Sequence, residues 1–416
     1  MKFPVIDYRA HPAFRQFATP YAYDDELIAG HIRAIDSVHL RVGGSVPAAR
    51  DQVEQALAEI ATHVHAIKQH SIEVKAPIVA REWLGAAMDW VISELRYEYL
   101  RLVFSRSNFD GSGLDRTGQA HLAEMRARGF FLVDLDEREF EQIRRLVLER
   151  VPELRGQLEQ RPTARAVYSP SRVSPLGRAI DRALSKAGVL DVLSQYKRNP
   201  MRILGTGVEL SRPMQKWHSD IYSDCGLADG PLRYLHVDET DHTPKAMIYA
   251  TPVTPENGPT GIIPESNCWE RSEFRFRVYK GIDKITIARY GGYVAGAEYR
   301  VAARDPELRR IFMQLPVAFQ GSSHFGDDVL PDSALAGEIA PREFKFLSAG
   351  KGQALVFDGA RTLHRGSIVD NGERMALQVG FKNINDDQVK RAADGGGPLG
   401  KFLKKASKLA RMAVRG

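Results

Sequence analysis

Cysteine is scarce in this chain of 416 residues, which contains only Cys225 and Cys268. The two cysteines have neither the paired spacing of a structural zinc site nor the number needed for a disulfide framework, so a reducing cytoplasm is the expected environment. Long hydrophobic runs are also lacking. No segment approaches the roughly 18 consecutive apolar residues of a membrane-spanning helix, and the N-terminus has no apolar core of a signal peptide. We therefore expect neither export nor membrane insertion.

An excess of charge of either sign is also lacking over most of the chain. The formal net charge is +6, but residues 401–416 alone contain six lysines and arginines and no acidic residue. The rest of the chain is therefore close to neutral, and a basic groove for nucleic-acid phosphates is not expected. Apolar residues recur at helical spacing between the basic residues of 401–416. This segment is expected to form either an amphipathic helix on an anionic membrane surface or a terminal helix that packs on its own domain.

The composition that is present, with 43% hydrophobic and 26% charged residues, is ordinary for a globular enzyme and allows a large core. Helical periodicity runs through residues 48–70 and 81–106. From about residue 201 short β-like runs dominate, 284–290 among them, as in a sandwich or barrel. We expect an α+β protein with a mainly β core. Its expected units are an N-terminal helical region (1–112), a β domain (113–390), a glycine-rich hinge (391–400) and a basic amphipathic C-terminal helix (401–416).

The most informative motif is His236-Val237-Asp238, followed far downstream by His364 and then by Arg374. Two imidazoles and one carboxylate can hold a ferrous ion on one face and leave the opposite positions open for a chelating cosubstrate and dioxygen. An arginine forms a bidentate pair with a carboxylate such as the far end of 2-oxoglutarate. Together these residues indicate an oxygenase.

Several stretches around these residues carry a resemblance to a known family. They are 129–134 (GFFLVD), 235–267 with its Asn-Gly-Pro turn at 257–259, 354–366 (ALVFDGARTLHRG) and 372–381 (GERMALQVGF). Over roughly residues 115–385 the chain resembles the phytanoyl-CoA dioxygenase-like family of iron(II)/2-oxoglutarate oxygenases. The resemblance implies a double-stranded β-helix, a jelly-roll of the cupin-like type, with flanking helices. The sequence departs from the family pattern at 264–267, which reads Pro-Glu-Ser-Asn where the family has Pro-Gly-Ser-His.

The resemblance also implies roles for individual residues. The expected Fe(II) ligands are His236, Asp238 and His364, and the expected contacts of 2-oxoglutarate are Arg374, Tyr249 and Lys245. Alternation along the strand does not decide which of Lys245 and Tyr249 points inward. The expected reaction is hydroxylation of a small molecule, lipid or saccharide, with release of succinate and CO2. Hydroxylation is favoured over halogenation because related halogenases lack the carboxylate that Asp238 provides.

A second motif of the same type, His218-x-Asp220, competes for the role of metal ligand. His236 lies nine residues before Lys245, which fits the compact members of the family, where one loop joins the ligands to the next strand. His218 would require an additional strand between the ligands and that strand. We favour His236 and Asp238 and keep His218 and Asp220 as the alternative.

The residues between His364 and Arg374 allow a geometric expectation. Segment 370–372, Asp-Asn-Gly, is a hairpin turn signal. A two-residue loop would turn Arg374 away from the face that carries His364. A three-residue loop, with Gly372 in the left-handed conformation, would place Arg374 opposite Ile368 and on the same face as His364. We predict the three-residue loop.

Two other classes of function are compatible with the same residues. A cupin-like barrel with similar ligands can bind zinc or manganese without using 2-oxoglutarate. A non-catalytic protein could instead act at a membrane surface through residues 401–416. The full set of ligands plus Arg374 favours the oxygenase, with a small-molecule substrate and no nucleic-acid partner. Neither the substrate nor the oligomeric state follows from the sequence.

Overall fold

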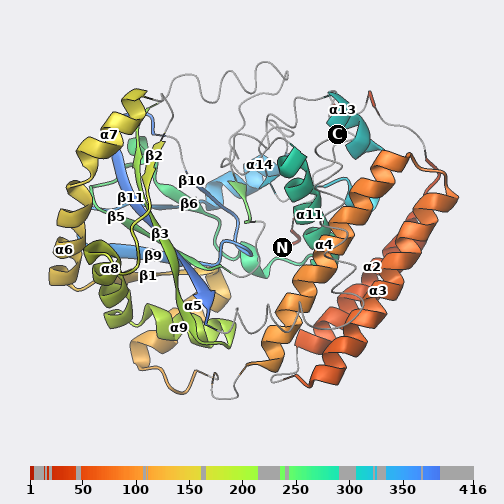
Figure 1. Ribbon diagram of the computed structural model, residues 1–416, viewed down its shortest axis with the longest axis horizontal. Helices are drawn as coiled ribbons and strands as arrows, with labels where there is room; N and C mark the ends of the chain where they lie inside the picture. The colour runs from red at the N-terminus through yellow and green to blue at the C-terminus, as the bar shows by residue number, and fades with distance from the viewer. Residues whose placement is uncertain are drawn as a thin grey trace.

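The computed structural model describes most of the chain. The described residues are 1–3, 14, 16–17, 21–43, 48–105, 109, 111–160, 165–213, 235–238, 243–289, 306–321, 324–325, 334–366 and 369–384. They form two halves that lie side by side, a β-rich half with helices on its outer side and a half built from long helices (Figure 1). His218, Asp220, the hinge at 391–400 and the C-terminal segment 401–416 fall outside the described residues, so the predictions for them stay predictions.

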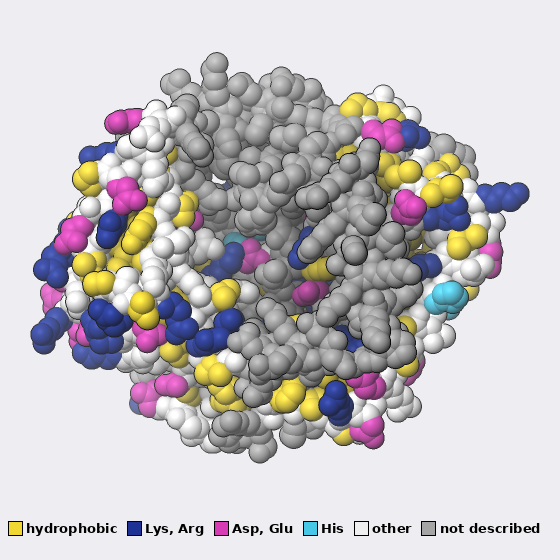
Figure 2. Space-filling model, viewed as in Figure 1, with side chains coloured by type: hydrophobic (Ala, Val, Ile, Leu, Met, Phe, Trp, Pro, Cys, Tyr) yellow, Lys and Arg dark blue, Asp and Glu magenta, His cyan; other side chains and the backbone are white. Residues whose placement is uncertain are grey.

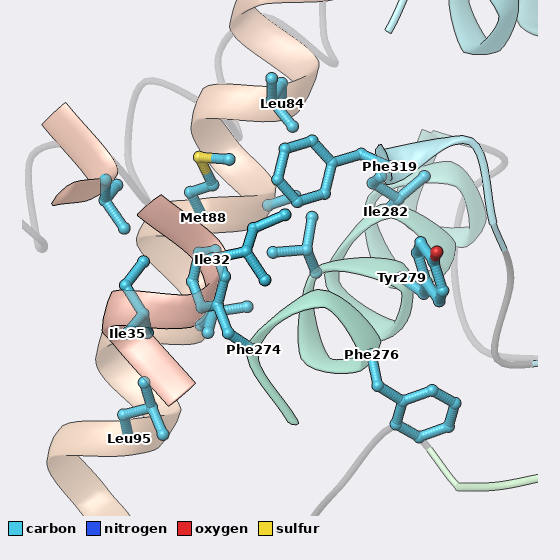
Figure 3. Packing of buried hydrophobic residues seen from close by; sticks show 14 of the residues in the cluster. Ile32, Ile35, Leu84, Met88, Leu95, Phe274, Phe276, Tyr279, Ile282 and Phe319 are labelled. Atoms are coloured by element: carbon cyan, nitrogen blue, oxygen red, sulfur yellow. The ribbon is translucent and has the colours of Figure 1, made fainter. Parts of the chain in front are cut away.

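The helical half contains long helices whose buried side chains recur every three or four residues. They are α2 (Asp25–Gly43), α3 (Arg50–Glu73) and α4 (Ile78–Val103). The helices α3 and α4 agree with the predicted helical periodicity. Two later helices pack against this group, α11 (Glu273–Arg289) and α13 (Pro306–Met313). Figure 3 shows Phe274 of α11 turned toward the side chains of α2 and α4 and Ile282 beside Phe319, whereas Phe276 points away from them.

The larger sheet is antiparallel, and its described strands follow the order β1, β9, β5, β11, β3, β2. Their bounds are β1 (Phe130–Asp134), β2 (Arg165–Tyr168), β3 (Met201–Ser211), β5 (Lys245–Tyr249), β9 (Gln353–Phe357) and β11 (Arg374–Asn383). Side chains alternate between the faces, so Ile248 packs under the outer helices and Tyr249 points inward. The outer helices are α5 (Arg116–Arg128), α6 (Glu137–Leu148), α7 (Val151–Gln160), α8 (Pro175–Lys186) and α9 (Val189–Lys197).

The smaller sheet is also antiparallel, with its described strands in the order β7, β4, β10, β6, β8. Their bounds are β4 (Leu235–His236), β6 (Thr260–Ile262), β7 (His324–Phe325), β8 (Phe344–Phe346) and β10 (His364–Gly366). Its inner face packs on the inner face of the larger sheet, where Ile262 and Phe346 share a core cluster with Tyr249 and Leu355. The observed fold is thus a mixture of helices and two antiparallel sheets that face each other.

The helical half covers the outer face of the smaller sheet. Leu235 and Val237 flank His236, Leu363 precedes His364, and all three hydrophobic side chains belong to the same core cluster as α2, α4 and α11. Because side chains alternate along a strand, the two histidines point to the opposite, inner side. The strands β4 and β10 therefore lie between the larger sheet and the helical half.

Short helical elements connect these units. They are α14 (Ala334–Ile339), η2 (Pro255–Asn257), η3 (Ser266–Cys268), η4 (Val317–Phe319) and η5 (Ala340–Arg342). None of the helices in the described part of the chain has both the length and the apolar character needed to cross a lipid bilayer.

The expected hairpin between His364 and Arg374 is wrong. Strand β10, which begins at His364, belongs to the smaller sheet, and β11, which begins at Arg374, belongs to the larger one. Segment 370–372 carries the chain from one sheet to the other. Gly372 does adopt the predicted left-handed conformation, with φ of 73°. The turn signal describes the local backbone, whereas the partner of each strand is decided by how the two sheets pack.

The expected strand at 284–290 is also wrong, because α11 continues to Arg289. Alternating isoleucine and threonine in this stretch is typical of a strand. The buried positions Phe274, Val278 and Ile282 recur four residues apart and pack against the N-terminal helices. Packing of this helical face outweighs the local β propensity.

Candidate metal centre

His236, Asp238 and His364 converge on the inner face of the smaller sheet. His236 and His364 are directly opposite each other on β4 and β10, with ring centroids 4.4 Å apart. Nε2 of His364 lies 3.7 Å from Oδ1 of Asp238, and Nε2 of His236 lies 4.0 Å from the same atom. One donor atom from each residue lies within 4.8 Å of the others. Among the described residues, this is the group of three that could hold a metal ion.

The backbone around Gly359 positions the Asp238 carboxylate. The Asp238 N–H donates a hydrogen bond of 2.8 Å to the Gly359 carbonyl oxygen. A Cβ atom at position 359 would collide with Oδ2 of Asp238, so the carboxylate lies directly against this glycine. Oδ1 accepts a hydrogen bond of 2.7 Å from Nζ of Lys245, whereas the buried Oδ2 has no hydrogen-bond partner. A buried carboxylate oxygen is costly to leave without a partner, which fits a ligand for a cation.

The charge state of the cluster also suits a cation. Burial by itself would raise the pKa of the Asp238 carboxyl, but Lys245, His364 and His236 together hold this pKa well below its usual range. Burial, reinforced by His236, lowers the pKa of His364 to about 3. Asp238 is therefore ionised and His364 neutral at physiological pH. These are the protonation states that metal binding requires of a carboxylate and an imidazole.

A backbone carbonyl determines which nitrogen of His364 faces the centre. Nδ1 lies 3.0 Å from the Thr362 carbonyl oxygen, which can only accept a hydrogen bond, so Nδ1 carries the proton. Nε2 then presents its lone pair toward Asp238. A hydrogen bond from the second ring nitrogen to a backbone carbonyl is the usual support of a metal-binding histidine. The imidazole and carboxylate donors fit a divalent transition metal such as iron, zinc or manganese.

Arg374 lies buried at the start of β11, opposite Ser211 of β3. Its Nη1 donates to the Gly258 carbonyl oxygen, and its Nη2 donates to Oγ of Ser211 at 3.3 Å. The buried Nε has no hydrogen-bond partner. A buried guanidinium with an unused donor is suited to bind an anionic group.

Tyr249 lies beside Arg374 on the inner face. Its hydroxyl donates to Oγ1 of Thr260 at 2.8 Å and accepts a hydrogen bond from the Thr260 N–H at 2.7 Å. Burial raises the pKa of Tyr249, although Arg374 acts in the opposite direction, so the phenol stays protonated. Thr260 is two residues from Ile262, which stands opposite His364, a separation of roughly 7 Å along the strand. Tyr249, with Arg374 beside it, therefore lies on the same inner side as His364.

Lys245 and Tyr249 both point inward, so no choice between them was needed: residues four apart on one strand lie on the same face. They are four residues apart on β5, and their partners on β11 are Gly380 and Ala376. Lys245 contacts Asp238, whereas Tyr249 contacts Thr260. The predicted site residues thus line one face of the larger sheet and the adjoining strands of the smaller one.

Some residues of the centre were not predicted. Gly359 and Thr362 orient Asp238 and His364 through their backbone carbonyls, and Thr260 holds the Tyr249 hydroxyl. Gly359 and Thr362 lie within the stretch 354–366 that carries the family resemblance, so their position near His364 was a usable signal. His218 and Asp220 lie outside the described residues, and the choice between the two motifs stays a prediction.

The surface is hollowed between the β-rich half and the helical half. Figure 2 shows acidic, basic and histidine side chains gathered inside this hollow, near the centre of the view. In Figure 1 the strands β10 and β6 end in the same part of the molecule.

Comparison with known proteins gives distant structural likenesses. No family model matches the chain, and no curated protein matches it. The epimerase SnoN from nogalamycin biosynthesis is 11% identical, with 64% of this chain and 83% of that chain covered and a TM-score of 0.34. HygX from Streptomyces hygroscopicus, with nickel and 2-oxoglutarate bound, is 14% identical, with 65% and 88% covered and a TM-score of 0.34. AviO1 from Streptomyces viridochromogenes Tue57 is 12% identical, with 66% and 97% covered and the same TM-score. Similarity at this level assigns no function.

Proposed function

We propose that this protein is an Fe(II)/2-oxoglutarate-dependent oxygenase. The observation that carries the proposal is the convergence of His236, Asp238 and His364, with an ionised carboxylate whose buried Oδ2 has no hydrogen-bond partner. Two imidazoles and one carboxylate on one side of a ferrous ion leave its other positions open. Arg374 supports the specific use of 2-oxoglutarate, because it lies buried beside Tyr249 on the inner face with an unused Nε donor.

The finer assignment of the fold follows from the same proposal. We propose that the two facing antiparallel sheets form a double-stranded β-helix of the phytanoyl-CoA dioxygenase-like type. The order of the strands supports it, since β5 follows the His236 motif, and β10 and β11 supply His364 and Arg374 from different sheets. The active unit would then be the β domain at 113–390, with the N-terminal region 1–112 as an addition to it.

Each residue of the centre has a role in this proposal. The metal would be held by His236, Asp238 and His364, and the far carboxylate of 2-oxoglutarate by Arg374 and Tyr249. Lys245 would keep Asp238 ionised through its 2.7 Å hydrogen bond. The bound metal and 2-oxoglutarate would supply the oxidising power for hydroxylation of a small-molecule, lipid or saccharide substrate, with release of succinate and CO2. Buried apolar side chains on the inner face, such as Met247 and Phe357, would keep water from the reacting groups.

An anaerobic absorbance titration of the purified protein tests this proposal. Fe(II) followed by 2-oxoglutarate should produce a charge-transfer band that neither addition produces alone. The band should survive in His218→Ala and disappear in His236→Ala. Arg374→Met should raise the concentration of 2-oxoglutarate needed for the band by at least about tenfold, because a charge-assisted bidentate pair is lost.

The same titration distinguishes the alternatives. A band lost in His218→Ala and kept in His236→Ala would transfer the metal ligands to the other motif and leave the function unchanged. Metal binding without any band on addition of 2-oxoglutarate would contradict the oxygenase. That result would instead favour a zinc or manganese enzyme on the same scaffold.

A further inference from the structure

The segment between β9 and β10, the ligand segment, connects the candidate metal centre to the rest of the molecule. It runs through residues 358–363 and contains Gly359 and Thr362, whose carbonyl oxygens accept hydrogen bonds from Asp238 and His364. Any shift of this segment would move both ligands at once. The contacts that hold it in place are therefore relevant to metal binding.

The helix α11 contacts this segment through charged side chains. Lys280 is buried, and its Nζ donates a hydrogen bond of 2.9 Å to the Ala360 carbonyl oxygen. Glu273, in the first turn of α11, accepts a hydrogen bond of 2.9 Å from Arg361. Burial would raise the pKa of Glu273, but Arg361, Arg271 and Arg277 hold it well below its usual range. A fully buried lysine is rare because its ammonium group is costly to desolvate, so this contact is a specific feature of the fold.

The N-terminal helices in turn fix α11. The Phe274 N–H donates to Oδ1 of Asp36 on α2 at 2.9 Å, and Arg277 pairs with Glu98 on α4 at 2.6 Å. Gly281 packs so closely on α4 that a Cβ atom there would lie 3.0 Å from the Ala87 carbonyl oxygen. Figure 3 shows the hydrophobic part of the same contact. A continuous set of contacts thus leads from α2 and α4 through α11 to the ligand segment.

The ligand segment is held at both of its ends by other elements. At its start, Asp358 accepts hydrogen bonds from Nζ of Lys197 at 2.6 Å and from the Tyr196 hydroxyl at 3.0 Å, both on α9. At its end, Leu363 packs into the core of the helical half, as do Leu235 and Val237 beside His236. The helical half therefore lies directly behind the strands that present the metal ligands.

We propose that α11 positions the metal ligands and that the N-terminal helical region acts on the metal centre through it. Lys280 and Glu273 are positioning residues in this scheme, since neither is itself a ligand. The inference rests on the proposed function only in requiring a metal at His236, Asp238 and His364, and it does not depend on 2-oxoglutarate. Energetic coupling is reciprocal, so metal binding must also stabilise α11 and α4.

A titration with Co(II) tests the role of Lys280. Lys280→Met should weaken Co(II) binding roughly 10–100-fold, as loss of a group that orients a metal ligand commonly does, and should alter the visible Co(II) spectrum. Lys280→Arg should recover part of the affinity. Lys284→Met is the matched control, because Lys284 lies one turn further along α11, exposed and over the Trp90 ring. A folded Lys280→Met protein with the affinity and spectrum of the wild type would overturn the proposal.

Hydrogen exchange of the wild-type protein provides a second test that does not depend on the folding of a variant. Co(II) should slow exchange several-fold in α11 and α4 as well as in residues 353–366, and leave α6, on the far side of the larger sheet, unchanged. His364→Ala should show no slowing. Slowing of exchange that is confined to residues 353–366 would overturn the proposal.

The two proposals can fail separately. A Co(II) effect on α11 without a charge-transfer band on addition of 2-oxoglutarate would support the positioning role and contradict the oxygenase. A normal charge-transfer band in the wild type, together with an unchanged Co(II) affinity in Lys280→Met, would support the oxygenase and contradict the positioning role. Wild-type protein that binds neither Fe(II) nor Co(II) would overturn both the oxygenase and the positioning role.

Discussion

Asp238 shows how the surroundings of a single residue can suit it to metal binding. Its N–H is held by the Gly359 carbonyl, its Oδ1 by Lys245, and its Oδ2 is buried against Gly359 without a hydrogen bond. The space for Oδ2 exists only because position 359 has no side chain. Glycine is often placed where a second group must approach the backbone closely.

The variant Gly359→Ala should therefore lose metal affinity. The added methyl group would displace Oδ2 of Asp238 and approach Cε1 of His364, so Co(II) should bind at least about tenfold more weakly, the lower end of what is usual when a ligand loses its support. Isothermal titration calorimetry with Co(II) measures this. Gly366→Ala is the control, since a Cβ atom there meets nothing within 4 Å. Equal affinity in the two variants would show that Gly359 does not determine the position of the carboxylate.

Much of the centre could be predicted at this scale. His236, Asp238 and His364 were recognised from their residue types and order, and the structure brings them together. Lys280 and Thr260 could not be found in this way, because a lysine in a helix or a threonine in a strand is ordinary until its neighbours from other elements are known. Their contacts lie 80 residues and 11 residues away along the chain.

At the scale of elements, the junction between α5 and β1 links the outer helices to the ligand segment. The helix ends at Gly129, which has φ of 82°, and β1 begins at the next residue. The Gly129 carbonyl oxygen accepts hydrogen bonds from the Asp358 N–H at 3.1 Å and the Thr362 hydroxyl at 3.3 Å. A side chain at this position would collide with Thr362.

We expect Gly129→Ala to lower the free energy of unfolding by about 2–4 kcal/mol, because a left-handed backbone and a steric overlap both oppose the methyl group. Gly156→Ala in α7 is the control. Its Cβ atom meets nothing within 4 Å, and alanine in a helix should raise the free energy of unfolding by up to about 1 kcal/mol. Urea denaturation followed by circular dichroism measures both values. A loss below about 1 kcal/mol for Gly129→Ala would show that the junction relaxes easily.

Elements were predicted unevenly. The long helices α3 and α4 and the strands β3, β5, β9 and β11 were indicated by periodicity, which depends on residues close in sequence. The pairing of β10 with β4 and β6 was not, because strand partners are chosen by the packing of the two sheets. The strand expected at 284–290 is part of a helix instead, because the apolar face of α11 is buried against α4.

At the scale of the whole molecule, the candidate metal centre lies between two hydrophobic cores. One contains the inner faces of both sheets, and the other joins the N-terminal helices to α11 and to the back of the smaller sheet. Side chains on β4 alternate between them, with His236 toward the first and Leu235 toward the second. If α11 positions the ligands as proposed, a change in the helical half would alter His236, Asp238 and His364 without contacting them.

The segment 401–416 gives a prediction that concerns the whole protein. If this basic segment binds membranes, the full chain should sediment with vesicles that contain phosphatidylglycerol, since each basic residue near an anionic surface contributes about 1 kcal/mol. A protein ending at residue 400 should stay in the supernatant and bind Co(II) as tightly as the full chain. A variant with the six basic residues replaced by glutamine is the control for charge. Equal sedimentation of full and shortened chains would contradict the prediction.

The sequence by itself determined the set of donor groups, the helical or extended character of most segments and the left-handed turn at Gly372, because each depends on residue chemistry or on neighbours a few positions away. Only the tertiary structure decided that His236 meets His364, that β10 and β11 join different sheets and that Lys280 reaches the ligand segment. These contacts join distant parts of the chain. They are selected by burial of hydrophobic surface and by pairing of buried polar groups over the whole molecule, which no local pattern records.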